Sequence, residues 1–273
     1  MRDTIQTMRI LGFFVMSFTA AAAASAADIH PIVEAESGFL FGTHLEGKWL
    51  DAGKTAKLMK PGTEFRLYSL TAEAGSAKGG KPESSGEPCP DTVMVPLDPK
   101  PRKAAVGIAA PWNALPRVPR VTATTQPVYI KAARDFLTSR GLQDPQVKLT
   151  QVLRVDLDGD GEEEVLLSAT NYRTSDASGG IHSSASAGDY SFVLLRRVVK
   201  GKVRTQLIEG EFYPEAKVFN APNRYRVDAV LDLDGDGTLE VIVGAAYYEG
   251  RWTTIYGCAP DKIEELLATG CGA

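Results

Sequence analysis

The sequence predicts a mainly β fold with one short helix, arranged as a small β-rich N-terminal unit followed by a larger β unit. Short β-prone runs separated by turn residues fill most of the chain. Strong helical spacing of apolar residues occurs within residues 125–141. Two Asp- and Gly-rich loops each lie between apolar, β-prone runs. A hydrophobic fraction of 44% and a charged fraction of 23% are ordinary for a globular protein.

Residues 1–26 have the pattern of an export signal. Arg2 and Arg9 supply positive charge before an apolar run that extends from Ile10 to Ala24. Ala24-Ser25-Ala26 then fits a small-residue cleavage site. The alternative is an uncleaved anchor, but about 15 apolar residues are fewer than the ~20 that span a bilayer. We therefore predict a periplasmic or secreted protein with no stable membrane span after cleavage near Ala27.

Residues 27–95 are predicted to form the small β-rich unit. A Glu46-Gly47 turn separates two β-prone runs, and an alternating run over 64–70 predicts another strand. A short helix is predicted over 51–59 and a last strand over 92–95. The Gly- and Ser-rich segment 75–90 is predicted to be a loop, because its likeness to a phosphate-binding P-loop lacks the required Ser or Thr.

Residues 96–122 are predicted to be a proline-rich linker or arm. Proline has a fixed φ and no N–H donor, so its repeated use predicts no regular structure between residues 96 and 119. Trp112 and Leu115 favour an arm that packs on the protein. The prolines are Pro96, Pro99, Pro101, Pro111, Pro116 and Pro119.

Residues 123–273 are predicted to contain the helix and the larger β unit. Thr125 can cap the start of the helix and Gly141 can end it. A Ser-, Gly- and Ala-rich loop is expected over 174–188. The apolar helix positions are Tyr129, Ala132, Ala133, Phe136 and Leu137. Strands are predicted over residues 147–155, 164–170, 191–199, 203–208, 225–231 and 240–247, and in a last hairpin over 252–269.

The three cysteines, Cys89, Cys258 and Cys271, lack the spacing of a metal site. An oxidising compartment allows one disulfide among them. The predicted last hairpin places Cys258 beside its turn and Cys271 at its far end, whereas the Cα atoms of a disulfide lie within about 7 Å. Cys89 is therefore expected to pair with Cys271 or with Cys258, which leaves the third thiol free.

The loops 156–164 and 232–240 share the pattern Asp-Leu-Asp-Gly-Asp-Gly-x-x-Glu. Ca²⁺ takes six to eight oxygen ligands at ~2.3–2.6 Å, which aspartates at loop positions one, three and five can supply inside a tight coil. The glycines permit positive φ angles, and the leucine is expected to face the core. The candidate calcium ligands are Asp156, Asp158, Asp160, the carbonyl of Glu162 and Glu164, and in the second loop Asp232, Asp234, Asp236, the carbonyl of Thr238 and Glu240.

Other interpretations of the loops are less consistent with the sequence. An EF-hand needs a Glu at position twelve and flanking helices, but Leu167 or Val243 stands there among β-prone residues. Mg²⁺ prefers to keep several waters. A metal-free acidic turn is disfavoured, because clustered carboxylates repel one another without a cation. We expect two Ca²⁺ ions that stabilise the fold rather than carry a signal.

Each strand–loop–strand segment resembles the FG-GAP, or VCBS-type, repeat of bacterial surface proteins and integrin α-chain propellers. The run Glu240-Val241-Ile242-Val243-Gly244-Ala245 matches that repeat closely. The resemblance covers residues 147–273 and implies Ca²⁺ binding by the same loop oxygens. Because only two copies are present, it implies a partial, propeller-like antiparallel β-sheet unit rather than a complete propeller.

No sequence motif indicates an enzyme. HExxH and G-x-S-x-G are absent, and His182, with Ser183 and Ser184, has no orienting partner in the sequence. A net charge of −4 gives no reason to expect nucleic acid. The leading hypothesis is a non-catalytic, calcium-stabilised binding or surface module for a protein or glycan partner. The alternatives are an exported hydrolase, with its site between the N-terminal unit and the larger sheet, and a structural envelope protein. A candidate recognition face comprises Tyr247, Tyr248, Trp252 and Tyr256.

Overall fold

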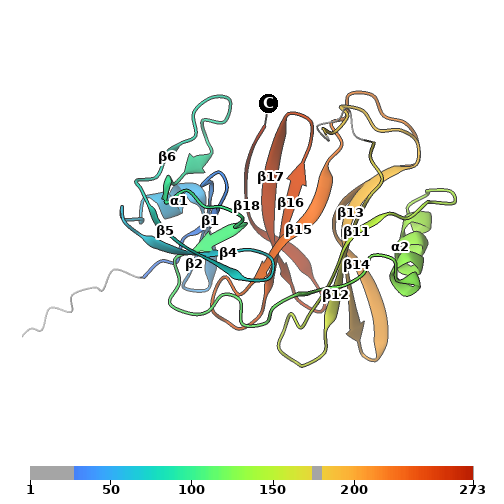
Figure 1. Ribbon diagram of the computed structural model, residues 1–273, viewed down its shortest axis with the longest axis horizontal. Helices are drawn as coiled ribbons and strands as arrows, with labels where there is room; N and C mark the ends of the chain where they lie inside the picture. The colour runs from blue at the N-terminus through green and yellow to red at the C-terminus, as the bar shows by residue number, and fades with distance from the viewer. Residues whose placement is uncertain (1–27, 174–179, 273) are drawn as a thin grey trace, which may run out of the picture.

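The computed structural model describes residues 28–173 and 180–272, which form a mainly β molecule (Figure 1). The strands build a curled antiparallel half-barrel sheet and several further sheets, which confirms the predicted fold class. The predicted export signal, residues 1–26, lies outside the described residues. Within the described part of the chain, no helix is long and apolar enough to cross a membrane.

The N-terminal unit is a seven-stranded sheet in the order β3-β2-β1-β9-β4-β5-β8, accompanied by the two-stranded β6-β7. Helix α1 (Ala52–Ala56) lies within the predicted helical segment, and the Asp51 carboxylate caps it by accepting the Lys54 N–H at 2.9 Å. The strands are β1 (Ile32–Glu34), β2 (Leu40–Leu45), β3 (Lys48–Asp51), β4 (Glu64–Tyr68), β5 (Glu73–Gly79), β6 (Glu83–Ser84), β7 (Val93–Met94), β8 (Leu97–Asp98) and β9 (Val106–Ile108).

Two predictions about this unit are wrong. Proline does not exclude regular structure from residues 96–119, because β9 lies between Pro101 and Pro111 and contains no proline. Strand β9 is fully buried and pairs with β1 on one side and β4 on the other. Likewise, β5 occupies part of the Gly- and Ser-rich segment predicted to be a loop. A three-residue strand is too short to show a periodicity, so the sequence pattern could not reveal β9.

The C-terminal unit consists of a five-stranded sheet, β10-β11-β12-β13-β14, and a four-stranded sheet, β15-β16-β17-β18. Every strand predicted after the helix is confirmed, and β14 extends well beyond its predicted end. The elements are β10 (Arg120–Val121), α2 (Pro127–Ser139), β11 (Leu149–Val155), β12 (Glu164–Thr170), β13 (Asp189–Val199), β14 (Lys202–Tyr213), β15 (Arg224–Leu231), β16 (Glu240–Ala246), β17 (Gly250–Cys258) and β18 (Ile263–Gly272).

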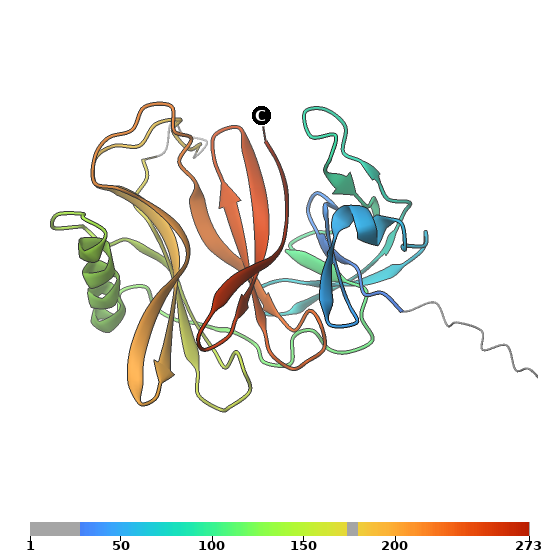
Figure 2. The same cartoon turned by 180° about the vertical axis from the view of Figure 1, so that it is seen from behind.

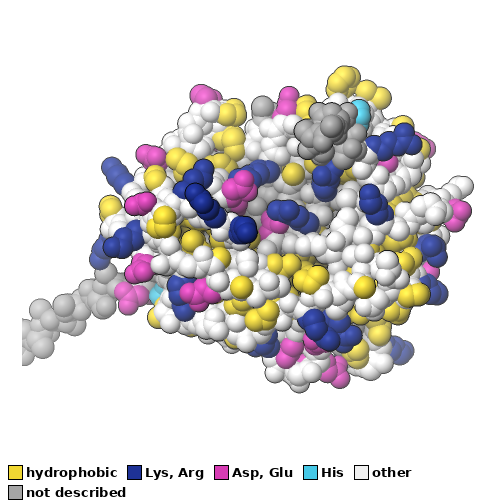
Figure 3. All heavy atoms as spheres, in the orientation of Figure 1, with side chains coloured by type: hydrophobic (Ala, Val, Ile, Leu, Met, Phe, Trp, Pro, Cys, Tyr) yellow, Lys and Arg dark blue, Asp and Glu magenta, His cyan; other side chains and the backbone are white. Residues whose placement is uncertain are grey.

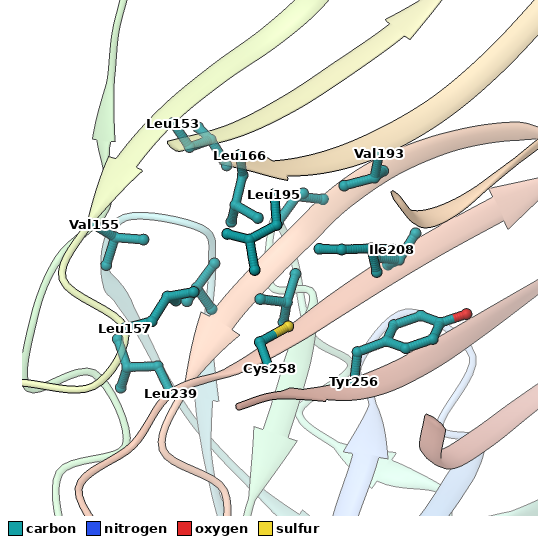
Figure 4. Packing of buried hydrophobic residues seen from close by; sticks show 14 of the residues in the cluster. Leu153, Val155, Leu157, Leu166, Val193, Leu195, Ile208, Leu239, Tyr256 and Cys258 are labelled. Atoms are coloured by element: carbon teal, nitrogen blue, oxygen red, sulfur yellow. The ribbon is translucent and has the colours of Figure 1, made fainter. Parts of the chain in front are cut away.

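Helix α2, the five-stranded sheet, the four-stranded sheet and the N-terminal unit stand side by side in that order (Figure 2). Each C-terminal sheet therefore packs against a neighbour on both faces, and neighbouring residues of one strand enter different cores. Leu166 of β12 faces the four-stranded sheet, whereas Leu167 packs toward α2. In β16, Val241 faces the five-stranded sheet and Ile242 faces the N-terminal unit. Figure 4 shows the core between the two C-terminal sheets.

The ends of α2 agree with the sequence only in part. Gln126, not Thr125, is the N-cap residue, and its side chain makes no capping hydrogen bond. Pro127 begins the helix, where a missing N–H costs nothing because that position has no helical acceptor. Gly141 follows the last turn with φ +91°, as expected for a residue that ends a helix.

Cys89 and Cys271 form a disulfide with a Cα–Cα distance of 5.7 Å, which selects one of the two predicted pairings. Cys258 is free and buried, and it belongs to the core between the two C-terminal sheets. The bond joins residues 182 positions apart, so it attaches the N-terminal unit to the last strand.

We expect Cys89→Ser to lower the free energy of unfolding by about 2–5 kcal/mol, because opening a large covalent loop enlarges the unfolded ensemble. Thermal melting with and without reductant measures the effect. Reductant should lower the melting temperature of the parent protein and of Cys258→Ala, which keeps the bond, but not that of Cys89→Ser. Equal sensitivity in all three proteins would contradict the assigned pairing.

Candidate metal centres

The two acidic loops occupy equivalent places in neighbouring sheets. The first joins β11 to β12 and the second joins β15 to β16, and both lie at the lower end of the molecule in Figure 1. In each hairpin the residue before the first aspartate pairs with the closing glutamate: Val155 with Glu164, and Leu231 with Glu240. The closing glutamate is thus held by the strand ladder, at the base of its own loop.

Backbone N–H groups hold the first loop in a tight coil. The Asp156 carboxylate accepts from Gly159 N at 2.6 Å and from Gly161 N at 3.0 Å. Both glycines have positive φ, 79° and 90°. Glu164 Oε2 accepts from Leu157 N at 2.9 Å, and the Leu157 side chain is buried, as expected.

The second loop repeats this arrangement. Asp232 accepts from Gly235 N at 2.7 Å and from Gly237 N at 3.2 Å, with φ angles of 80° and 88° at the two glycines. Glu240 Oε2 accepts from Leu233 N at 2.8 Å, and Leu233 is fully buried. Matching backbone geometry in two separate hairpins follows from the shared sequence pattern.

Each loop gathers acidic oxygens that could hold a metal ion. The groups whose ligand atoms all lie within 4.8 Å of one another are Asp156, Asp158 and Glu164, and Asp232, Asp234 and Asp236. Asp160 and Glu240 are predicted ligands outside these two groups. The Asp160 carboxylate accepts from the backbone N–H of Glu162 at 2.7 Å, and the Asp236 carboxylate accepts from that of Thr238 at 2.6 Å.

Burial makes these carboxylates unfavourable as isolated charges. Loss of solvent raises the pKa of Glu164, and the neighbouring charge of Asp158 raises it further. In the second loop, desolvation raises the pKa of Asp232 and Asp234, and together with the neighbouring aspartates it raises the pKa of Glu240 to about 9. A bound cation would offset the cost of burying these charges, and all the side-chain donors are oxygens, which suits a hard cation.

The second loop is the more buried of the two, because the N-terminal unit and the proline-rich arm cover it. The Trp112 indole donates to Asp232 O at 2.9 Å, and its ring would lie 3.2 Å from a Cβ at Gly235. Asp232 N in turn donates to Ala114 O at 2.8 Å. From β2, His44 Nδ1 lies 3.7 Å from Asp234 Oδ2. The expectation that Trp112 and Leu115 pack the arm onto the protein is confirmed.

Arg117, at the end of the same arm, bridges both loops. Its guanidinium donates to Asp156 O at 2.6 Å and Leu157 O at 3.1 Å in the first loop, and to Gly237 O at 2.6 Å in the second. The loops also touch directly, because Leu239 N donates to Leu157 O at 2.8 Å. Sequence reasoning missed Arg117 and His44. The only available signal for Arg117 was its place in an arm expected to pack on the protein.

The structure supports the other two candidate sites, the aromatic face and the His182 segment, only in part or not at all. Tyr247 contacts Tyr248 and Trp252 at ring-centroid distances of 5.6 and 5.7 Å. Tyr256 is instead buried between the two C-terminal sheets, and its hydroxyl donates to Glu209 at 2.6 Å. The prediction of a four-residue aromatic face is therefore wrong for Tyr256. His182 makes no hydrogen bond with Ser183 or Ser184 among the described residues.

Comparisons with known proteins add no family to this geometry. No protein-family model, no curated protein and no solved structure matches the chain. The resemblance to the FG-GAP repeat therefore stays a prediction drawn from the loop residues. The class that the fold and the loops define is a mainly β protein with two acidic groups that could hold a metal ion.

Arg117→Met should weaken divalent-cation binding at both loops, because one guanidinium orients backbone groups of each. We expect about a tenfold loss at each site, the typical effect of removing hydrogen bonds to a charged group. Isothermal calorimetry on the intact protein measures it. Arg134→Met, which removes an exposed arginine on α2, is the matched control, and an effect confined to one site would contradict the bridging role.

Proposed function

We propose that this chain is an exported calcium-binding protein of the FG-GAP or VCBS-like type, acting as a non-catalytic binding or surface module in which Ca²⁺ stabilises the fold. The observation that carries the proposal is the pair of matching acidic coils, tied together by Arg117. Export follows from the sequence pattern of residues 1–26.

Calcium is the cation that best suits the donor set. Each loop offers carboxylate oxygens, with a backbone carbonyl expected at position seven, and no nitrogen or sulfur donor belongs to either acidic group. Zn²⁺ prefers His and Cys ligands, and Mg²⁺ keeps several waters in a strict octahedron. A coil rich in short carboxylates supplies the larger oxygen sphere that Ca²⁺ takes.

The position of the loops supports a structural role for the ion. Each loop closes a hairpin whose strands contribute to the core between the two C-terminal sheets. Leu157 of the first loop is buried in that core, whereas Leu233 of the second loop is buried in the core shared with the N-terminal unit. Extracellular sites often bind Ca²⁺ with dissociation constants of about 10⁻⁴–10⁻³ M. An ion present at a hundred times its dissociation constant would stabilise the fold by about 2.7 kcal/mol. Ion binding would therefore stabilise the folded hairpins.

An exported hydrolase is the second candidate, and one observation favours it. Asp228, in a cleft beside the N-terminal unit, has a pKa raised by burial, which is common among catalytic acids. We favour a binding module because no catalytic sequence motif accompanies Asp228, which is paired with Arg226 at 2.6 Å. A purely structural envelope protein would use the same calcium sites.

We expect Ca²⁺ to raise the melting temperature of the purified protein by about 5 °C or more per ion, and EGTA to reverse the shift. Asp232→Asn should lower stability more than Asp156→Asn, since the second loop is the more buried. Asp261→Asn, in the exposed β17–β18 turn, is the matched control. If calorimetry detects no Ca²⁺ binding and chelation leaves the melt unchanged, the proposal fails.

A further inference from the structure

A charged cleft lies where the N-terminal unit meets the edge strand β15. Two cavities of about 400 and 260 Å³ adjoin there and share four lining residues, Glu34, Glu36, Arg226 and Asp228. Figure 3 shows Lys and Arg side chains gathered around acidic ones near the middle of this face. The combined space is in the size range of small-molecule sites.

The cleft exists because the N-terminal unit covers only part of the four-stranded sheet. Ala229, Leu231 and Ile242 pack against the N-terminal unit in a continuous core. Farther along the same strands, charged and small residues replace the apolar ones and the face is open. These residues are Arg224, Arg226 and Asp228 of β15, Gly244 and Ala246 of β16, and Arg251 and Thr253 of β17.

Asp228 is aimed into the cleft by a β-bulge. The register of β15 against β16 shifts between Val227 and Ala229, which leaves Asp228 as an extra residue. Gly244 provides the space for its carboxylate, since a Cβ there would lie 2.0 Å from Asp228 Oδ2. Arg226 Nε donates to Oδ1 at 2.6 Å, whereas Oδ2 accepts no hydrogen bond from the described residues. Burial raises the pKa of Asp228.

The remaining charges leave a local excess of positive charge. Arg251 is held by Glu36 at 2.7 Å and by Glu34 at 3.7 Å, and Glu34 is fixed in turn by the Ser37 N–H at 2.8 Å. By contrast, Arg224 and Lys103, which also line the cleft, form no ion pair among the described residues. In a protein with a net charge of −4, this positive region would attract an anionic ligand.

We propose that this cleft binds a carboxylate-bearing saccharide, such as a uronate-containing oligosaccharide. Lys103 in the larger cavity and Arg224 in the smaller one each offer a cationic contact to a sugar carboxylate, and Asp228 Oδ2 accepts hydrogen bonds from ring hydroxyls. Gly244, Ala245 and Ala246 carry no bulky side chain, so they leave a wall of the cleft against which a sugar ring can lie. The proposal names the ligand of the binding module proposed above and rests on that function.

The test is calorimetric titration of the calcium-loaded protein with digalacturonate, its methyl ester and cellobiose, at one fixed free Ca²⁺ concentration. We expect binding of digalacturonate and at least tenfold weaker binding of the two uncharged sugars. Arg224→Gln and Lys103→Gln should each weaken binding about tenfold, the usual loss for one charge-assisted contact. Asp228→Asn should weaken binding of the same ligand through its lost acceptor.

Arg204→Gln, which removes an exposed arginine of β14 outside the cleft, is the matched control and should bind as the parent does. Equal affinity for the three sugars, no binding at all, or an equal loss in the control would each overturn the proposed site. Binding accompanied by new reducing ends would support the site but overturn the non-catalytic function. Calcium-dependent melting without sugar binding would reject the site alone.

Discussion

The structure depends on the repulsion among carboxylates that two short hairpin loops force together. Each loop turns its aspartates inward through positive-φ glycines and fixes a glutamate on the strand at its base. Since those strands also form the core between the C-terminal sheets, electrostatic strain in the loop acts on the same residues that bury apolar surface. A divalent cation held by these groups would turn the repulsion into attraction and would couple the charge of the loop to the packing beneath it.

The proline-rich arm extends this dependence to the whole molecule. Trp112 packs on the second loop, and Arg117 donates to backbone carbonyls of both. The arm connects the N-terminal unit to the five-stranded sheet. The conformation of the loops and the position of the N-terminal unit are therefore coupled. That unit in turn forms one wall of the charged cleft. The candidate metal sites and the cleft differ in role, but the same proline-rich arm contacts both.

Most of the C-terminal unit could be predicted from sequence, because its strands are long, apolar and bounded by strong turn signals. β12 and the leucines under the loops lie where the pattern indicated. The N-terminal unit was harder to predict. Strand β9 has only three residues, and β5 consists mostly of Gly, Ser and Ala, a composition that favours a loop. Arg117 and Asp228 act through tertiary placement, by an arm that folds back and by a bulge, and no local pattern encodes either.

Both outer faces of the paired C-terminal sheets are occupied. Helix α2 covers one through Tyr129, Ala133 and Leu137, and the N-terminal unit covers the other. A complete propeller grows by stacking one more blade on an apolar face. Here the apolar part of each outer face is already covered, and the part of the four-stranded sheet that stays open carries the charged residues of the cleft. The ends are sealed by elements unlike a blade, so duplication of this gene segment could lengthen the array only if α2 or the N-terminal unit were displaced.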